Sequence, residues 1–244
     1  MNNNHSLEPR HDGAGNPISN HVLCSISQEE FRKLCPALEF VKLNQHRSLY
    51  RRARIMQAAY FINSGVASLI LVGEDGRSVE VGVVGCEGLT GTALMAGLRR
   101  APCSAVMQIE GSAFRMDGDA FEKATRSLTE FRDRVLRYSV IHTMQVAQTA
   151  ACNRLHDARQ RLARWLLMAH DRISSNVVKL THEFLAIMLG TDRPSVSLAA
   201  KYLQQLGAIE YRRRALTIVN RKMLEGASCR CYFAVQRYNP AVGL

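Results

Sequence analysis

The sequence lacks long hydrophobic runs. None of its apolar stretches approaches the roughly 20 residues that a membrane-spanning helix requires. The N-terminal segment MNNNHSLEPRHDGAGNP has no apolar run behind a basic start, so we predict no signal peptide. With 47% hydrophobic and 22% charged residues, the 244-residue chain has a globular composition and room for two domains. We expect a cytoplasmic protein with no membrane partner.

A regular set of cysteines is also missing. The seven cysteines are an odd number at irregular spacing, which favours reduced thiols over a disulfide framework. Cys24 and Cys35 have no third cysteine nearby, unlike the ligands of an iron–sulfur cluster. Cys229 and Cys231 are too close together for an ordinary zinc loop, and no His/Cys pair in the sequence completes them. We therefore predict neither an iron–sulfur nor a zinc site. No nucleophile–base pattern indicates an enzyme either.

Acidic residues are scarce in the C-terminal part only. Residues 151–244 hold 15 Lys and Arg against 6 Asp and Glu, a net charge of +9. The first 150 residues hold 17 against 15, so they supply only +2 of the total of +11. A basic excess confined to one part of the chain is typical of a domain that meets phosphate, although a solvated basic surface is the plainer alternative.

The first half of the chain alternates short apolar runs with turn residues. Residues 1–20 are polar and predicted to be disordered. Residues 21–120 begin with a helix capped by Ser27 and continue with strands such as AYFINSG and SVEVGVVG. Glu74-Asp-Gly-Arg77 is a hairpin turn candidate. We predict an antiparallel, jelly-roll-like β-roll, and hence an α+β protein.

Residues 121–152 contain no Pro or Gly, so they are predicted to form one long helix. Apolar residues recur along it at alternating three- and four-residue steps, a spacing typical of a coiled-coil seam. The alternative is that this stripe packs on the β-roll of its own chain; we favour a homodimer interface. His142 lies on the stripe, either as a packed histidine or as a haem ligand or pH sensor. The expected interface comprises Leu128, Phe131, Val135, Tyr138, His142, Gln145 and Thr149.

Residues 153–244 carry the pattern of a winged helix-turn-helix that reads double-stranded DNA. Thr181 is an N-cap candidate, Gly190 can end that helix in the left-handed conformation, and Pro194 fits the first turn of the next helix. A hairpin through Arg212-Arg213-Arg214 then forms a basic wing suited to the phosphate backbone. The outward residues of the second helix have the types that bind base edges and phosphates in the major groove. The expected DNA contacts are Thr181, His182, Arg193, Ser195, Ser197, Lys201, Arg212, Arg213 and Arg214.

The segments LTHEFLAIMLG-TDRPSV and LQQLGAIEYRRRALTIVNR resemble the DNA-binding domain of the Crp/Fnr superfamily of bacterial regulators. The preceding order of β-roll, long helix, hinge and RLARWLL is similar to that superfamily over roughly residues 25–235. The resemblance implies a transcription regulator whose homodimer reads a palindromic operator under effector control, and in many members contacts RNA polymerase. It also implies that Arg193 reads bases and that Thr181 contacts a phosphate. Pro194 and Leu198 depart from residues that commonly contact DNA, so the operator is expected to differ from the best-known palindrome.

Cyclic-nucleotide-binding members of this superfamily use a Gly-Glu pair and a later Arg-Ser pair. Here Thr92 replaces the Glu, and Pro102 and Cys103 stand near the position of the Arg. Arg99 and Arg100 are the nearest substitutes, but the motif as a whole disfavours a cyclic nucleotide and leaves the effector unidentified. The alternative is a constitutive or architectural DNA-binding dimer. The expected effector pocket comprises Gly91, Thr92, Arg99, Arg100, Cys103 and Ser104.

Overall fold

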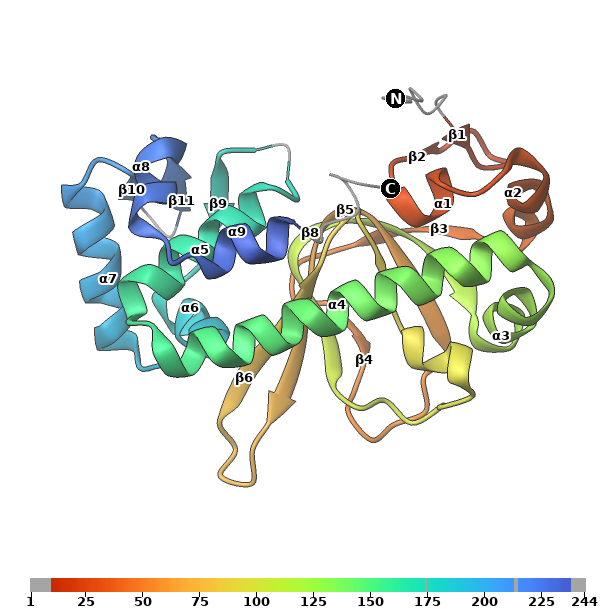
Figure 1. Ribbon diagram of the computed structural model, residues 1–244, viewed down its shortest axis with the longest axis horizontal. Coiled ribbons are helices and arrows are strands. Elements are labelled where there is room, and N and C mark those ends of the chain that lie inside the picture. The colour runs from red at the N-terminus through yellow and green to blue at the C-terminus, as the bar shows by residue number, and fades with distance from the viewer. Residues whose placement is uncertain (1–9, 174, 213–214, 238–244) are drawn as a thin grey trace.

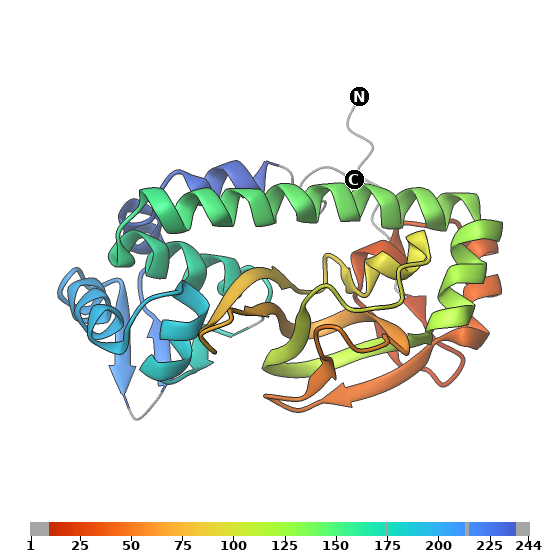
Figure 2. The same ribbon diagram turned by 90° about the horizontal axis from the view of Figure 1, so that it is seen from below.

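The computed structural model describes residues 10–173, 175–212 and 215–237. Figure 1 shows two bodies joined by one long helix: an N-terminal β-roll with its flanking helices, and a mainly helical C-terminal domain. The long helix lies across both bodies, and Figure 2 shows it running along one side of the molecule. No helix in the described part of the chain is long and apolar enough to cross a membrane.

The β-roll is a six-stranded antiparallel sheet with the order β3-β8-β5-β6, in which β4 also pairs with β8 and β7 with β5. The predicted hairpin turn is confirmed, because Gly73 N donates to Arg77 O at 2.8 Å and Gly76 adopts a φ of +77°. This β5–β6 hairpin projects from the roll beside the C-terminal domain (Figure 1). The strands are β3 (Glu39–Leu43), β4 (Ser48–Tyr50), β5 (Ala58–Val72), β6 (Ser78–Val84), β7 (Leu89–Thr90) and β8 (Ser104–Asp117).

The N-terminal segment is ordered earlier than predicted. Residues 1–9 lie outside the described residues, but 10–20 are not disordered, because β1 (Arg10–His11) pairs with β2 (Pro17–Ile18). The Arg10 side chain fixes this hairpin by donating to the carbonyl oxygens of Leu23 and Ile26. Three short helices follow, and Ser27 caps the second of them as expected. They are α1 (His21–Cys24), α2 (Gln28–Leu34) and the 3-10 helix η1 (Cys35–Ala37).

The predicted single helix over 121–152 is two helices. α3 (Gly118–Ser127) ends at Leu128, whose backbone is extended, and α4 (Thr129–Leu155) starts anew. The Glu30 carboxylate caps α4 by accepting from the backbone N–H groups of Glu130 and Phe131, at 3.1 and 2.8 Å. The break has a tertiary cause: a side chain 100 residues away satisfies the first N–H groups of the helix. Without knowledge of that contact, the sequence favours a continuous helix.

The predicted dimer stripe on α4 instead packs against the β-roll of its own chain. Phe131 and Val135 are fully buried, and Tyr138 and Gln145 are nearly so. Tyr138 lies so close to the roll that a Cβ at Gly88 would be 1.9 Å from its ring. Phe131, Val135, Tyr138 and Gln145 therefore complete the core of their own chain and are not free to meet a partner chain. Leu128, His142 and Thr149 are half-buried on the same stripe, and their place in a dimer interface stays a prediction.

The C-terminal domain has a second hydrophobic core. α4 runs through most of the expected hinge and ends at His156, after which Asp157 caps the next helix. Its small sheet has the order β10-β11-β9 and forms the predicted wing. The helices are α5 (Ala158–His170), α6 (His182–Leu189), α7 (Arg193–Gln205), α8 (Arg221–Ala227) and α9 (Cys231–Gln236). The strands are β9 (Val177–Lys179), β10 (Ile209–Arg212) and β11 (Ala215–Ile218).

Candidate nucleic-acid interface

Helices α6 and α7 form a helix-turn-helix whose ends are fixed by local hydrogen bonds. Thr181 Oγ1 accepts from Phe184 N at 3.2 Å, and Gly190 ends α6 with a φ of +56°. Asp192 caps α7 by accepting from Ser195 N at 2.7 Å, while Pro194 occupies the first turn. The Thr181 cap, the left-handed Gly190 and the place of Pro194 agree with the sequence prediction. α7 presents one face to the core and the other to solvent.

Several of the predicted DNA-contacting side chains lie together at the start of α6 and α7. Arg193 is exposed and forms an ion pair with Glu183, Nε to Oε1 at 2.8 Å. His182 Nδ1 lies 2.9 Å from Ser197 Oγ, and the His182 ring stacks on Tyr211 at 4.5 Å. Burial lowers the pKa of His182, and the nearby Arg193 charge lowers it further. His182 and Ser197 thus serve to join the two helices, whereas Arg193 extends to solvent.

The remaining predicted contacts are spread along α7 and the wing. Ser195 lies in the first turn of α7, and exposed Lys201 lies further along the helix. Arg212 is exposed at the end of β10, where Nη2 lies 3.4 Å from Glu210 Oε2. The predicted contacts Arg213 and Arg214 lie outside the described residues. Leu198, the apolar residue that departs from the superfamily's usual DNA contacts, is 70% exposed on α7.

The residues of the predicted effector pocket do not converge on one anion site. Gly91 adopts a φ of +87° and begins the 3-10 helix η2 (Thr92–Ala96). Arg99 is paired with Asp119 and with Glu122 of α3, whereas Arg100 donates to Ala53 O at 3.1 Å. Ser104 Oγ accepts from Arg52 N at 3.0 Å, and burial raises the pKa of the Cys103 thiol. Arg99 and Arg100, the nearest substitutes for the guanidinium that a cyclic phosphate requires, therefore already have other partners.

The β5–β6 hairpin and the C-terminal domain share a buried polar junction. Glu80 on β6 is 4% exposed, and its Oε1 accepts from Trp165 Nε1 of α5 at 2.8 Å. Ser68 on β5 donates to the other oxygen of the same carboxyl. Burial raises the pKa of Glu80 to about 7, which the two hydrogen bonds oppose. One carboxyl group thus connects the roll to the first helix of the C-terminal domain.

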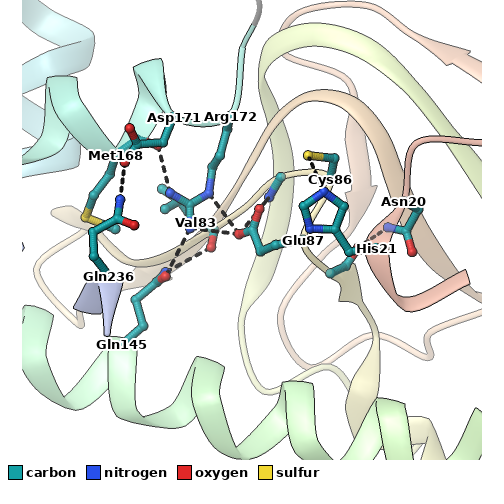
Figure 3. A network of polar contacts seen from close by, with 12 residues as sticks. Asn20, His21, Val83, Cys86, Glu87, Gln145, Met168, Asp171, Arg172 and Gln236 are labelled. Atoms are coloured by element: carbon teal, nitrogen blue, oxygen red, sulfur yellow. Dashed lines mark hydrogen bonds and ion pairs between the residues drawn. The ribbon is translucent and has the colours of Figure 1, made fainter. Parts of the chain in front are cut away.

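A second buried junction, shown in Figure 3, joins the roll, α4 and the end of α5. Arg172 Nη2 lies 2.7 Å from Glu87 Oε1, and both side chains are more than nine-tenths buried. The same guanidinium donates to Met168 O at 2.7 Å and to Gln145 Oε1 at 3.1 Å. Gln145 in turn donates to Val83 O at 2.9 Å. Although burial raises the pKa of Glu87, the Arg172 charge and hydrogen bonds more than offset this and hold it below its usual value.

Sequence reasoning missed both junctions. The only signal for Glu80 was a carboxylate inside the apolar strand SVEVGVV, and Glu87 and Arg172 are 85 residues apart. A cavity of about 580 Å³ lies beside Arg172, lined also by Asn63, Glu110 and Lys179. The cavity borders both the roll and the segment that leads into β9, so a molecule bound there would contact both domains.

Sequence reasoning also missed a second apolar stripe on α4, on the face away from the roll. Leu136, Val140 and Met144 follow at four-residue steps and are 50%, 54% and 39% exposed. Ala147, Ala151 and Leu155 continue this face toward the C-terminal end of the helix and are also exposed. α4 is therefore apolar on two faces. The sequence interpretation chose the buried face because the spacing of its apolar residues is the more regular.

Two family models match the chain over the domains just described. The cyclic nucleotide-binding domain matches residues 40–127, and the Crp-like helix-turn-helix domain matches residues 160–227. Together they cover more than half of the chain, and α4 lies between the two matched regions. The chain belongs to the Crp/Fnr superfamily. The Crp-type proteins that this chain is similar to are transcriptional regulators, which are not enzymes.

Solved structures of Crp/Fnr-type regulators share this fold. A CRP-family transcriptional regulator from Thermus thermophilus is 21% identical with a TM-score of 0.64, over 77% of this chain and 96% of its own. FixK2 from Bradyrhizobium japonicum is 16% identical with a TM-score of 0.65, over 79% and 98%. The c-di-GMP responsive regulator CLP from Xanthomonas campestris is 13% identical with a TM-score of 0.63, over 79% and 99%. No curated protein is similar enough in sequence to match.

Proposed function

We propose that this Crp/Fnr-type protein is a homodimeric transcription regulator that binds a specific DNA sequence through α7. The observation that carries the proposal is the solvent face of α7, where Arg193 extends from a helix N-terminus fixed by the Asp192 cap. In a helix-turn-helix, the first residues of the second helix reach base edges in the major groove. The C-terminal excess of positive charge supplies the attraction to phosphate that this docking needs.

The second stripe on α4 supports a dimer. A solvent-exposed apolar stripe along a helix of 27 residues, at a spacing that allows helix pairing, is a surface that a second copy of the same helix can cover. A two-fold dimer places the same patch of both subunits face to face, so the patch must be able to pack against a copy of itself without like-charge repulsion. Leu136, Val140 and Met144 meet this requirement because they are apolar and uncharged. A dimer carries two helix-turn-helix motifs related by two-fold symmetry, and a palindromic operator has the matching symmetry.

The geometry of the β-roll supports an effector other than a cyclic nucleotide. Thr92 replaces the carboxylate that a ribose would need, and Arg99 is neutralised by Asp119 and Glu122. We infer that control acts at the domain junctions, because Glu80, Glu87 and Arg172 hold the C-terminal DNA-binding domain against the β-roll. A ligand that binds the cavity beside Arg172 would change the relative stability of this docked arrangement.

Selection of bound duplexes from a random-sequence DNA pool tests the proposal. We expect an inverted repeat whose half-sites are about one helical turn apart, retained as a complex of two chains per duplex. Enrichment of no sequence would contradict the proposal and favour an architectural DNA-binding protein. A thermal-shift screen of metabolites and cyclic nucleotides then tests control. A ligand that both raises Tm and changes operator affinity supports it, whereas unchanged, full operator binding with every ligand argues for a constitutive regulator.

A further inference from the structure

Three cysteines and a histidine gather where α4 meets the C-terminal helices. Cys152 and His156 lie four residues apart at the end of α4. Cys229 lies between α8 and α9, and Cys231 is the first residue of α9. Their ligand atoms all lie within 4.8 Å of one another. The three cysteines are buried apart from both hydrophobic cores, and the histidine is half-buried. The sequence prediction of no zinc site is therefore not confirmed. The His/Cys pair missing from the sequence pattern comes from the end of α4, more than 70 residues before Cys229 and Cys231.

The distances within this cluster fit one tetrahedral ion. Zn–S bonds of about 2.3 Å and Zn–N bonds of about 2.0–2.1 Å place ligand sulfurs about 3.8 Å apart, and a sulfur and a nitrogen about 3.6 Å apart. Cys152 Sγ lies 3.5 Å from Cys229 Sγ, and Cys231 Sγ lies 3.6 Å from His156 Nδ1. A two-iron cluster divides its ligands between two metal atoms and needs a wider spread than this. The cluster thus has the size of a mononuclear site.

Hydrogen-bond donors and one buried guanidinium surround the cluster. Gln148 Nε2 donates to Cys231 Sγ at 3.0 Å, and the Cys231 backbone N–H donates toward Cys229. The Arg164 side chain is 5% exposed; its Nη2 donates to Thr149, while its Nε has no hydrogen-bond partner. Its positive charge acts on Cys152 as well as on the Glu80 carboxyl. Three thiolates and one Zn²⁺ carry a net charge of −1, which a buried guanidinium complements.

The geometry points to a structural zinc site formed by Cys152, His156, Cys229 and Cys231. All four positions of the tetrahedron are filled by protein, as in structural rather than catalytic zinc sites. His156 is the residue at which α4 ends, so the ion holds the hinge between α4 and α5 as well as the segment before α9. Figure 1 shows α9 lying beside α4, the arrangement that such a site would fix. The site is independent of DNA binding and of any effector.

Metal analysis of the full chain, purified under reducing conditions without chelator, tests this site. We expect about one zinc per chain, and about none in Cys229→Ser or Cys152→Ser. Cys35→Ser, outside the cluster, is the matched control and retains the metal. Chelation should lower the Tm of the wild-type protein but leave that of Cys229→Ser unchanged, because a ligand of the folded state stabilises it.

Cobalt substitution identifies the ligands. Co²⁺ in the protein should give the visible bands of a tetrahedral site and a strong sulfur-to-cobalt charge-transfer band. His156→Cys should retain the metal and shift these bands, whereas His156→Ala should lose affinity. The proposal is overturned if reduced wild-type protein takes up neither Zn²⁺ nor Co²⁺. It is equally overturned if the metal content of Cys229→Ser equals that of the wild type, or if mass spectrometry of freshly isolated protein shows a Cys152–Cys229 disulfide instead.

Discussion

Trp165 donates its indole N–H to the carboxyl of Glu80 at 2.8 Å, from the first helix of the C-terminal domain to a strand of the β-roll. The carboxyl is buried and also accepts from Ser68. Since burial raises its pKa to about 7, the folded protein holds this proton more tightly than the unfolded chain does. The contact between the two domains is therefore sensitive to pH.

We predict that Glu80→Gln changes the pH dependence of stability. The folded pKa of Glu80 is raised, so its stabilising contribution is complete below the ordinary pKa of 4.5 and is lost as pH rises through about 7. The wild type should lose on the order of 3 kcal/mol relative to Glu80→Gln as pH rises from the ordinary pKa to above the folded one. Urea unfolding of both proteins across this range measures the difference. Parallel stability curves would show that Glu80 is ionised in the folded state at all these pH values.

His142 provides a second test of pH dependence, in which a fall in pH, and not a rise, lowers the stability of the fold. Burial lowers the pKa of His142 to about 4, and its Nε2 is buried without a hydrogen-bond partner. Its neutral form is favoured on folding, so the associated stability is complete above pH 6.5 and is lost as pH falls toward 4. In His142→Gln the acid-side decline in unfolding free energy should be shallower than in the wild type. An unchanged slope in that variant would mean that the imidazole is protonated in the fold.

The Glu87–Arg172 pair should be much more sensitive to substitution than an exposed pair. Glu87→Gln leaves a buried guanidinium without its counter-charge, which typically costs about 3–5 kcal/mol. The matched control is Glu39→Gln, which breaks the exposed Arg115–Glu39 pair and should cost about 1 kcal/mol or less. Chemical unfolding measures both values. Equal, small losses in the two variants would show that the buried pair does not hold the domains together.

The second stripe of α4 predicts which substitution produces a monomer. Val140→Glu places a charge from each subunit in the expected interface and should convert a dimer to a monomer in sedimentation experiments. Leu98→Glu is the control, since Leu98 is 63% exposed on the β-roll and lies far from α4 in the sequence. A Val140→Glu protein that sediments as a dimer would remove this stripe from the interface.

Local signals in the sequence were enough to predict the helix-turn-helix of α6 and α7. The cap at Thr181, the left-handed Gly190 and the hairpin turn at Gly76 all depend on neighbouring residues. Such short-range patterns predict the elements and their order, and with them the α+β class.

Long-range contacts were beyond the same reasoning. The break at Leu128 depends on Glu30, and the burial of the α4 stripe depends on how the roll closes against Tyr138. Periodicity indicates that a helix face is apolar but not what covers it. The residues that join the domains, Glu87 and Arg172, are ordinary charged residues in the sequence and acquire their role only through burial.

The most direct test of the proposed function compares the operator affinity of Arg193→Ala with that of Lys201→Ala. Each is measured on the selected operator and on a scrambled duplex at the same salt concentration. Arg193→Ala should lower the ratio of the two affinities about tenfold or more, because a base contact is lost. Lys201→Ala should weaken both duplexes by the same factor. Equal losses on both duplexes for Arg193→Ala would contradict sequence reading by the start of α7.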